Sequence, residues 1–163
     1  MAEIGPVVPA ITVRAARSED IEAITALTER FYCEESFDTP PDRLREHAMI
    51  LIESRTALVL LALIASNPVG FAITTTSFGL EHGWIAELED LYVCPGARRA
   101  GAARGLIEAA RGWAQTMGCS EFEVVIDPKG QARHGLAGFY TRLGFVDHGR
   151  RLLSHPLGAD TAP

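Results

Sequence analysis

The sequence predicts a mixed α/β fold in which helices pack around one sheet. Three observations predict this fold: strand-length apolar runs alternate with segments of helical periodicity, hydrophobic residues reach 47% against 22% charged residues, and no repeat or linker interrupts the 163 residues. A chain of this length and composition fits one domain with a buried core. We therefore expect one domain over residues 11–155, a flexible leader over 1–10 and a flexible tail over 156–163.

The first expected elements are a short strand and two helices. Ile11–Arg14 alternates in polarity like a strand, and Ser18 offers an N-cap for a helix that runs to about Cys33. The apolar stripe of this helix recurs every three or four residues, at Ile21, Ile24, Leu27, Thr28 and Phe31. We expect a loop over Glu34–Asp42 and a second, shorter helix over Arg43–Ser54.

Three strands are expected in the middle of the chain. Leu58–Ile64 is continuously apolar, and Val69–Ser77 is rich in threonine. The turn residues Ser66-Asn67-Pro68 separate these two segments, which indicates an antiparallel hairpin. The strand pattern returns over Trp84–Val93.

The rest of the chain alternates between helix and strand. Ala102–Met117 is the longest segment whose apolar residues recur at helical spacing, and Gly118 is expected to end this helix. The remaining expected elements are a strand over Glu121–Ile126, a helix over Ala132–Leu143 closed by Gly144, and a final pair of strands from Phe145 to Ser154.

Composition and charge exclude several classes of protein. The longest apolar run, Ala57–Ala65, is far shorter than the roughly 20 residues that cross a bilayer as a helix, so no membrane partner is expected. The formal net charge of -6 argues against nucleic-acid binding and favours a cationic partner. Residues 1–10 lack the features of a secretory signal, so we expect a cytoplasmic protein.

The cysteines and histidines do not indicate a metal site. Cys33, Cys94 and Cys119 have no paired spacing, and we expect each to be a small buried thiol. An acetyl-cysteine intermediate at Cys94 is disfavoured because the sequence places no histidine beside it. The histidines outside the second helix show no ligand spacing; they are His82, His134, His148 and His155.

The turn after Val93 carries the clearest chemical signal. It is built from small residues and contains Arg98, Arg99 and, just inside the next helix, Arg104, with no acidic residue among them. Small residues let a ligand approach the backbone, and the free N–H groups at the start of a helix attract anions. The turn therefore indicates a phosphate-bearing ligand, although a plain connection with solvated arginines is the alternative. It is neither a Walker loop nor a dinucleotide-binding glycine motif.

This turn resembles the signature of the GNAT superfamily of acyl-CoA-dependent N-acetyltransferases. Residues 98–103, Arg-Arg-Ala-Gly-Ala-Ala, match Arg/Gln-x-x-Gly-x-Gly/Ala, and Glu-Asp-Leu-Tyr-Val at 89–93 is typical of the fourth strand of the family. Residues 134–145 resemble a second family segment, Asn-x-x-Ala-x-x-Phe/Leu-Tyr-x-x-x-Gly-Phe, with His134 in place of asparagine. Arg99 and Ala103 stand where family members often have glycine. The resemblance implies a GNAT-like fold, whose central, mostly antiparallel sheet splays into a V between its fourth and fifth strands.

The resemblance also implies a binding site for acetyl-CoA in this V. The pantetheine arm is expected to pair with the backbone of the fourth strand, a backbone N–H near Leu91 or Tyr92 to stabilise the oxyanion, and the diphosphate to rest on the amides of residues 99–104. The implied cofactor-binding residues are Leu91, Tyr92, Val93, Arg98, Arg99, Ala100, Gly101, Ala102, Ala103, Arg104 and His134.

Three side chains are candidates for acid–base chemistry. By resemblance, Tyr140 is the general acid that reprotonates the departing thiolate, and its alternative role is packing beside Phe139. Glu87 and Glu89 alternate to one face of the fourth strand and are candidate bases for the amine, with Glu89 slightly favoured; an acidic strand end that only attracts cations is the alternative. Asp90 is expected to face the other way unless a bulge intervenes.

We therefore expect an N-acetyltransferase that acts on a primary amine in a ternary complex, without a metal. The acidic residues near the site, Glu81 and Asp90 included, favour a small cationic amine of the aminoglycoside or polyamine type. A protein lysine or N-terminal amine is the alternative acceptor, and a non-catalytic acyl-CoA-binding module is the alternative of another class. A homodimer is also possible, through the loop Thr75–Trp84 or the last strands.

Overall fold

Five strands form one sheet in the part of the chain that the computed structural model describes, residues 10–155 and 157. The sheet order is β1-β2-β3-β4-β5, with antiparallel pairs throughout except β4 and β5, which pair in parallel. The strands are β1 (Ile11–Ala15), β2 (Ala57–Ile64), β3 (Asn67–Gly79), β4 (Gly83–Val93) and β5 (Glu121–Val124). The mixed α/β class and the mostly antiparallel sheet are thus confirmed. The expected leader and tail lie outside the described residues, apart from positions 10 and 157.

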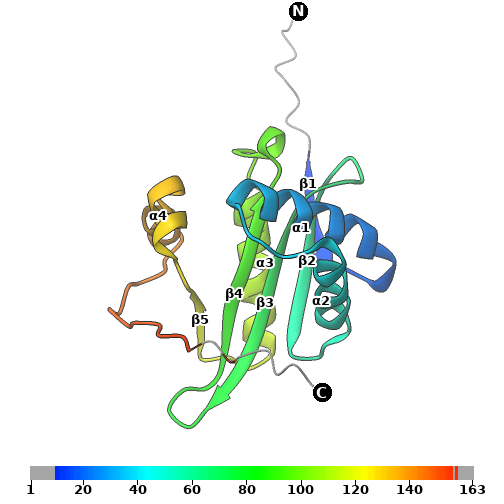
Figure 1. Cartoon of the computed structure of the whole chain (residues 1–163). Coiled ribbons are helices and arrows are strands. Elements are labelled where there is room, and N and C mark those ends of the chain that lie inside the picture. Colours follow the sequence, from blue (N-terminus) through cyan, green and yellow to red (C-terminus); the bar gives the residue numbers. More distant parts are fainter. Residues whose placement is uncertain (1–9, 156, 158–163) are drawn as a thin grey trace, which may run out of the picture.

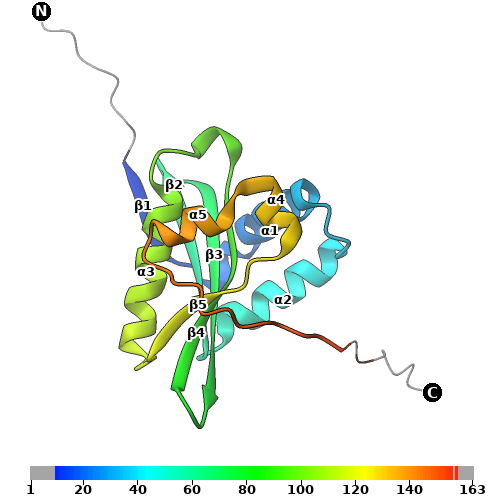
Figure 2. The same cartoon turned by 90° about the vertical axis from the view of Figure 1, so that its left-hand side faces the viewer.

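Helices cover both faces of this sheet. Figure 1 shows α1 and α2 in front of the sheet and α3 behind it, and the turned view in Figure 2 shows the sheet between these two layers. The helices are α1 (Ile21–Glu35), α2 (Pro41–Glu53), α3 (Ala102–Thr116), α4 (Pro128–His134) and α5 (Leu136–Thr141), with single 3-10 turns at Ser18–Asp20 and Pro95–Ala97.

Each face of the sheet has its own apolar core. Leu106, Ile107 and Ala110 of α3 pack against one face of the sheet, and Ile24 and Leu27 of α1 pack against the other. The continuously apolar β2 contributes to both cores because successive strand residues point to opposite faces. The continuous apolar run predicted β2 correctly because both faces of this strand are buried, and the apolar stripes predicted α1 and α3 because each buries one face.

Several boundaries of the first two helices differ from those expected. The first helix continues to Glu35, so Glu34 and Glu35 are helical and not part of the expected loop. Ser18 does not cap the first helix, since it begins a 3-10 turn and α1 starts at Ile21 with Asp20 as its N-cap. The second helix starts at Pro41 and so includes Asp42, because proline is well suited to the first helical position. The hairpin turn lies at residues 65–66, since β3 already begins at Asn67.

The C-terminal part departs furthest from the expectation. The expected single helix over 132–143 is two helices, because Asp127 caps an earlier start at Pro128 and Gly135 breaks the helix with a left-handed φ of 62°. The expected strand pair over 145–154 is absent from the described residues. A turn in which Asp147 accepts the N–H of Gly149 interrupts the alternation. That segment also leaves large apolar side chains in solvent, namely Val146, Leu152 and Leu153.

Among the described residues, none of the helices has the length and apolar character needed to cross a membrane.

Candidate active site

The candidate site is a cleft that opens where β4 and β5 separate. The two strands pair only as far as Leu88 and Val124; β5 ends there, while β4 continues to Val93. Asp127 then draws the chain away from the sheet by accepting two backbone N–H groups at the start of α4. The cleft between the diverging segments has a volume of about 430 Å³.

The walls of this cleft come from distant parts of the sequence. The end of α1 and the residues after it supply Phe31, Glu35 and Phe37, and the opposite wall comes from α3, α4 and α5. The sequence-predicted site residues that line the cleft are Glu89, Leu91, Tyr92, Val93, Arg98, Ala103, His134 and Tyr140. Those that lie outside its lining are Glu87, Arg99, Ala100, Gly101, Ala102 and Arg104.

A β-bulge at Glu89 determines which side chains face the α1 wall. Ile73 lies opposite Asp90, but the next residue of β3, Thr74, lies opposite Leu88, so Glu89 has no partner in the register. One extra residue reverses the alternation of side chains, which places Asp90 on the same face as Glu87. The expectation that Asp90 faces away from the glutamates is therefore wrong.

The bulge brings Glu87, Glu89 and Asp90 together on this face. Thr75, which lies opposite Glu87 on β3, donates its hydroxyl to Glu89 Oε1. Glu123 of β5 lies in register with Glu87 and adds a fourth negative charge. The result is an acidic wall beside the cleft.

Burial and the neighbouring negative charges raise the pKa of two of these carboxyls, Asp90 and Glu87. Burial, followed by the negative charge of Glu89, raises the pKa of Asp90 to about 6. Burial also raises the pKa of Glu87, with further contributions from Glu89 and Glu123. No described residue donates a hydrogen bond to the Asp90 carboxyl. The protonation of Asp90 therefore changes near neutral pH.

The turn that leads into α3 has the backbone conformation of an anion site. Arg99 and Gly101 both have left-handed φ values, 65° and 91°, and a Cβ at Gly101 would meet no atom within 4 Å. Glycine is therefore required there by the conformation, whereas Arg99 holds a φ that side chains disfavour. The amides of residues 99–104 donate to no oxygen of the described residues. Their N–H groups are thus free to bind an anion at the start of α3.

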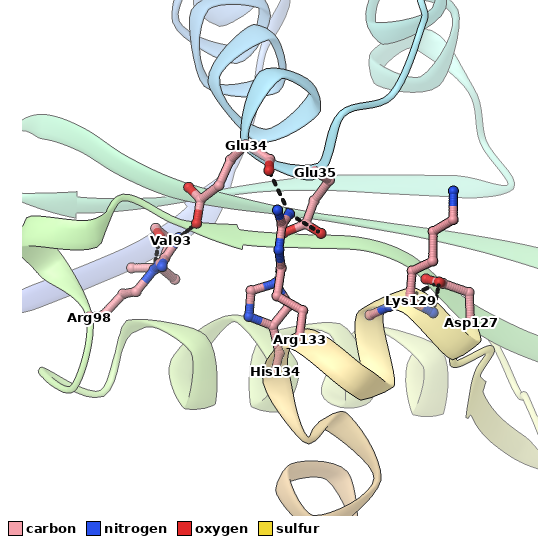
Figure 3. Close-up of polar contacts among 9 residues, drawn as sticks. Glu34, Glu35, Val93, Arg98, Asp127, Lys129, Arg133 and His134 are labelled. Carbon is pink, nitrogen blue, oxygen red and sulfur yellow. Dashed lines mark hydrogen bonds and ion pairs between the residues drawn. The ribbon is translucent and has the colours of Figure 1, made fainter.

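The side chains of Arg98 and His134 turn toward the end of α1 (Figure 3). Arg98 Nε donates to the carbonyl oxygen of Val93 at 2.8 Å, and its Nη2 lies 2.6 Å from Glu34 Oε1. His134 Nε2 lies 2.7 Å from Glu35 Oε1. The hydrogen bond from Arg98 lowers the pKa of the Glu34 carboxyl. Both expected cofactor residues thus have carboxylate partners within the chain.

Tyr140 lies buried on α5 in the lining of the cleft. Its ring packs against Phe139 and Phe145, with centroids 5.0 and 5.3 Å away. Burial raises the pKa of its phenol to about 12, so the hydroxyl keeps its proton throughout the neutral range. A group in this state can donate a proton into the cleft.

The sequence analysis missed the carboxylates at the end of α1. Glu34 and Glu35 lie in the last turn of a helix, where negative charge is unfavourable, and no basic residue accompanies them in that turn. Two acidic residues at a helix C-terminus without a basic neighbour could have predicted that Glu34 and Glu35 pair with cations from other parts of the chain. Glu81, which we expected in the acidic cluster, lies instead in the turn between β3 and β4, roughly 20 Å along the strand from the bulge.

The cysteines lie outside this arrangement. All three are free; Cys33 is exposed, and Cys94 and Cys119 are partly exposed, so the expectation that each is buried is wrong. Over the described ranges 10–155 and 157, no group of three or more His, Cys, Asp or Glu side chains is arranged to hold a metal ion.

Residues 21–145 match the family described as "Acetyltransferase (GNAT) family". A similar sequence is an aminoglycoside N(6')-acetyltransferase type 1 from Klebsiella aerogenes, which is 36% identical over 93 residues. That match covers 51% of this chain and 61% of the relative, so the chain spans less than two thirds of the relative's length.

Solved structures support the fold. An integron cassette protein from the mobile metagenome of Cole Harbour Salt Marsh superposes with a TM-score of 0.79 at 25% identity, over 90% of each chain. The aminoglycoside N-acetyltransferase AAC(6')-Iy, solved in complex with CoA, superposes with a TM-score of 0.80 at 19% identity, over 94% of this chain and 99% of that one.

Proposed function

The chain belongs to the GNAT acetyltransferase family, and we propose that it transfers an acetyl group from acetyl-CoA to a primary amine of a small cationic molecule. The observation that carries this proposal is the cleft between β4 and β5. Acidic side chains and a buried, protonated tyrosine line it, and a turn with free backbone amides adjoins it. In acyl transfer from a CoA thioester to an amine, these features can accept the proton of the amine, protonate the leaving thiolate and bind the diphosphate.

The residues of the turn fit a diphosphate. The free amides of residues 99–104 supply donors, and the open space at Gly101 leaves room for phosphate oxygens against the backbone. The edge of β4 beyond Leu88 is not paired with β5, so the backbone near Leu91 and Val93 can hold the pantetheine arm. When bound, acetyl-CoA supplies the acetyl group as an activated thioester.

The carboxylates of the acidic wall would hold the acceptor and take its proton. An amine with a pKa near 10 is protonated at neutral pH and must lose a proton before it attacks a carbonyl. Among the candidate bases Glu87, Glu89 and Asp90, we favour Asp90, because its pKa of about 6 leaves it ionised yet basic near neutral pH. Glu87 and Glu89 add negative charge that attracts the cation.

Tyr140 would supply the proton at the sulfur of the leaving thiolate. Its buried phenol lines the same cleft as Asp90. Because its pKa is about 12, the phenol is present in its donating form wherever Asp90 is ionised. Packing against Phe139 and Phe145 fixes the ring, which favours a defined direction for the proton.

The acceptor class rests on charge and on one relative. Negative charges from β4 and β5 crowd one side of the cleft, and aromatic side chains of Phe31 and Phe37 flank it. A compact molecule with more than one ammonium group fits such a wall better than a neutral or acidic metabolite. The similarity to an aminoglycoside acetyltransferase points to the same class of acceptor.

A panel of amines tests this proposal. Purified protein is mixed with acetyl-CoA and aminoglycosides, polyamines, a lysine peptide or a neutral monoamine, and free thiol is followed with a colorimetric reagent. We expect release with the multiply charged small amines and little with the others. Release only with the peptide would move the acceptor class to protein amines, and acetyl-CoA binding without release from any amine would contradict catalysis.

Tyr140→Phe provides a test of the acid. Removal of the phenolic hydroxyl should lower kcat about 100-fold at neutral pH, while acetyl-CoA binds as before, because the ring and its packing remain. Calorimetric titration with acetyl-CoA and a thermal melt check that the site is intact. Normal turnover by this variant would leave Tyr140 with a packing role only.

A further inference from the structure

The last turn of α1 gathers cations from two other parts of the chain (Figure 3). Glu34 pairs with Arg98 at 2.6 Å, and Glu35 pairs with His134 at 2.7 Å and with Arg133 at 3.2 Å. Arg133 also donates to the backbone carbonyl oxygen of Glu34 at 2.6 Å. One helix end thus joins the turn before α3 to α4, across the two sides of the cleft.

Two nitrogens of the Arg98 guanidinium, Nε and Nη2, are engaged by this arrangement. Its Nε donates to the Val93 carbonyl and its Nη2 to Glu34, and its carbon lies 5.8 Å from the centre of the Tyr92 ring. These contacts aim the side chain at α1, whereas the free amides of residues 99–104 belong to the backbone at the start of α3. The arginine of the signature therefore serves a different surface from the amides that follow it.

The same helix end forms part of the acceptor side of the cleft. Phe31, Glu35 and Phe37 line the cleft, and Phe31 packs against Tyr92 with ring centroids 5.4 Å apart. Whatever holds the last turn of α1 in place therefore sets the shape of this wall. The side chain that reaches this turn from the β4–α3 connection is Arg98.

We propose that the ion pair between Arg98 and Glu34 positions the α1 wall of the acceptor site, and that the Arg98 side chain is not a ligand of the cofactor diphosphate. Arg98 acts here as a positioning residue through Glu34 and α1. The inference rests on the proposed function, because it assigns a role within the same acetyl-transfer site. Under this proposal the backbone amides of the turn bind the cofactor, and the Arg98 side chain shapes the site of the acceptor.

Matched variants of the two partners distinguish this role from diphosphate binding. Glu34→Gln and Arg98→Gln each remove the ion pair, and Glu34 as an acid cannot itself bind a diphosphate. We expect both variants to raise the KM for the amine about fivefold, the size expected for losing one partly exposed ion pair, and to leave the Kd for acetyl-CoA within about twofold. The double variant with both changes should show the same amine KM as either single one. Glu29→Gln, an exposed change on the same helix, is the control.

Exchanging the charges of Glu34 and Arg98 should restore amine binding if the ion pair itself matters, whereas independent damage at each position would not be restored. Glu34→Arg alone should weaken amine binding more than Glu34→Gln, and the combination of Glu34→Arg with Arg98→Glu should recover most of the loss. Thermal melts of every variant check the fold. Recovery of the amine KM by the reversed pair would support the positioning role, and its absence with a folded protein would overturn it.

Titration with acetyl-CoA keeps this inference separate from the proposed function. If Arg98→Gln weakens acetyl-CoA binding tenfold or more while Glu34→Gln does not, Arg98 is a diphosphate ligand and the inference is wrong. If Glu34→Gln tightens acetyl-CoA binding, the carboxylate competes with the diphosphate for Arg98, which also overturns it. A wild-type protein that acetylates no amine would contradict the proposed function, whereas unchanged acetyl-CoA binding by Arg98→Gln would still support the inference about Arg98.

Discussion

Two aspartates of this chain have opposite electrostatic surroundings. Asp20, just before α1, accepts hydrogen bonds from Nη1 and Nη2 of Arg14 at 2.7 and 2.8 Å and from the backbone N–H of Arg17. The hydrogen bond from Arg14 lowers the pKa of Asp20 to about 2. Asp90, at the bulge of β4, has no described cation beside it, and burial raises its pKa to about 6.

The difference separates a carboxylate that holds the fold from one that is available for chemistry. Asp20 gives up its basicity to a neighbour that is always charged, so it can neither take a proton near neutral pH nor attract a ligand. Asp90 remains basic because burial disfavours its charged form and no cation among residues 10–155 and 157 offsets this, so its ionisation costs stability. A free carboxylate in a cleft is the arrangement expected where a ligand supplies the missing positive charge.

The largest effect expected from this comparison is on turnover. Asp90→Asn keeps the size of the side chain but removes its basicity, so we expect kcat/KM for the amine to fall about 100-fold. In the wild type the rate should rise as the pH passes through about 6, because Asp90 becomes ionised there. The variant should lose that limb of the pH profile.

A control and a competing base sharpen this test. Asp38→Asn, on an exposed loop, should leave both rate and pH profile unchanged. If Asp90→Asn keeps the wild-type profile and Glu89→Gln loses it instead, the bulged glutamate is the base, as the sequence analysis favoured.

The sequence predicted the frame of this site better than the site itself. Helices and strands follow from local periodicity, so the order from β1 to β5 and the turn before α3 could be expected. The bulge at Glu89 could not, because an extra residue in one strand becomes visible only in the register with its partner. One bulge changed the face of Asp90 and with it the preferred base.

Contacts between distant segments were beyond the reach of the pattern for a similar reason. Glu34 and Arg98 stand 64 residues apart, and no periodicity connects them. The prediction of two final strands was wrong for a different reason. Alternating polarity at 145–154 favours a strand only where a neighbouring strand offers an edge, and β5 is only four residues long. Tyr140 could be proposed as the acid from the sequence alone, because the resemblance assigns that role to a fixed position within one continuous segment.

The second effect is a contrast in how stability depends on pH. The raised pKa of Asp90 means that its ionisation destabilises the fold once the pH exceeds the unfolded value near 4, and fully above about 6. Asp90→Asn should therefore stabilise the protein by about 2 kcal/mol more at pH 8 than at pH 4.5. Asp20 behaves in the opposite sense, since its lowered pKa contributes stability above the unfolded value that is lost as the pH falls toward about 2.

Urea unfolding at the two pH values measures both variants. Asp20→Asn should destabilise by about 1 kcal/mol at pH 8 and by nearly the same amount at pH 4.5, because Asp20 is ionised in both and the partly exposed Arg14 is screened by solvent. If the change in unfolding free energy caused by Asp90→Asn were the same at both pH values, the charge of Asp90 would not destabilise the fold.

The smallest effect tests whether every unpartnered polar group belongs to the site. Thr74 lies opposite Leu88 on the α3 face of the sheet, fully buried, and its hydroxyl has no hydrogen-bond partner among the described residues. Thr74→Val should therefore stabilise the protein by about 1 kcal/mol, because a methyl group replaces an unsatisfied hydroxyl of similar size. Thr28→Val is the matched control, since the buried Thr28 hydroxyl donates to the Thr25 carbonyl oxygen at 2.9 Å and its loss should not stabilise.

Activity measurements complete the comparison with Asp90. Thr74 is outside the cleft lining, so Thr74→Val should raise the urea midpoint and leave turnover of the amine unchanged. Asp90→Asn should raise the midpoint and abolish most turnover. If Thr74→Val also lost activity, the Thr74 hydroxyl would have to influence the bulge through Leu88. The face of the sheet on which an unpartnered polar group lies would then not show whether the group serves the fold or the reaction.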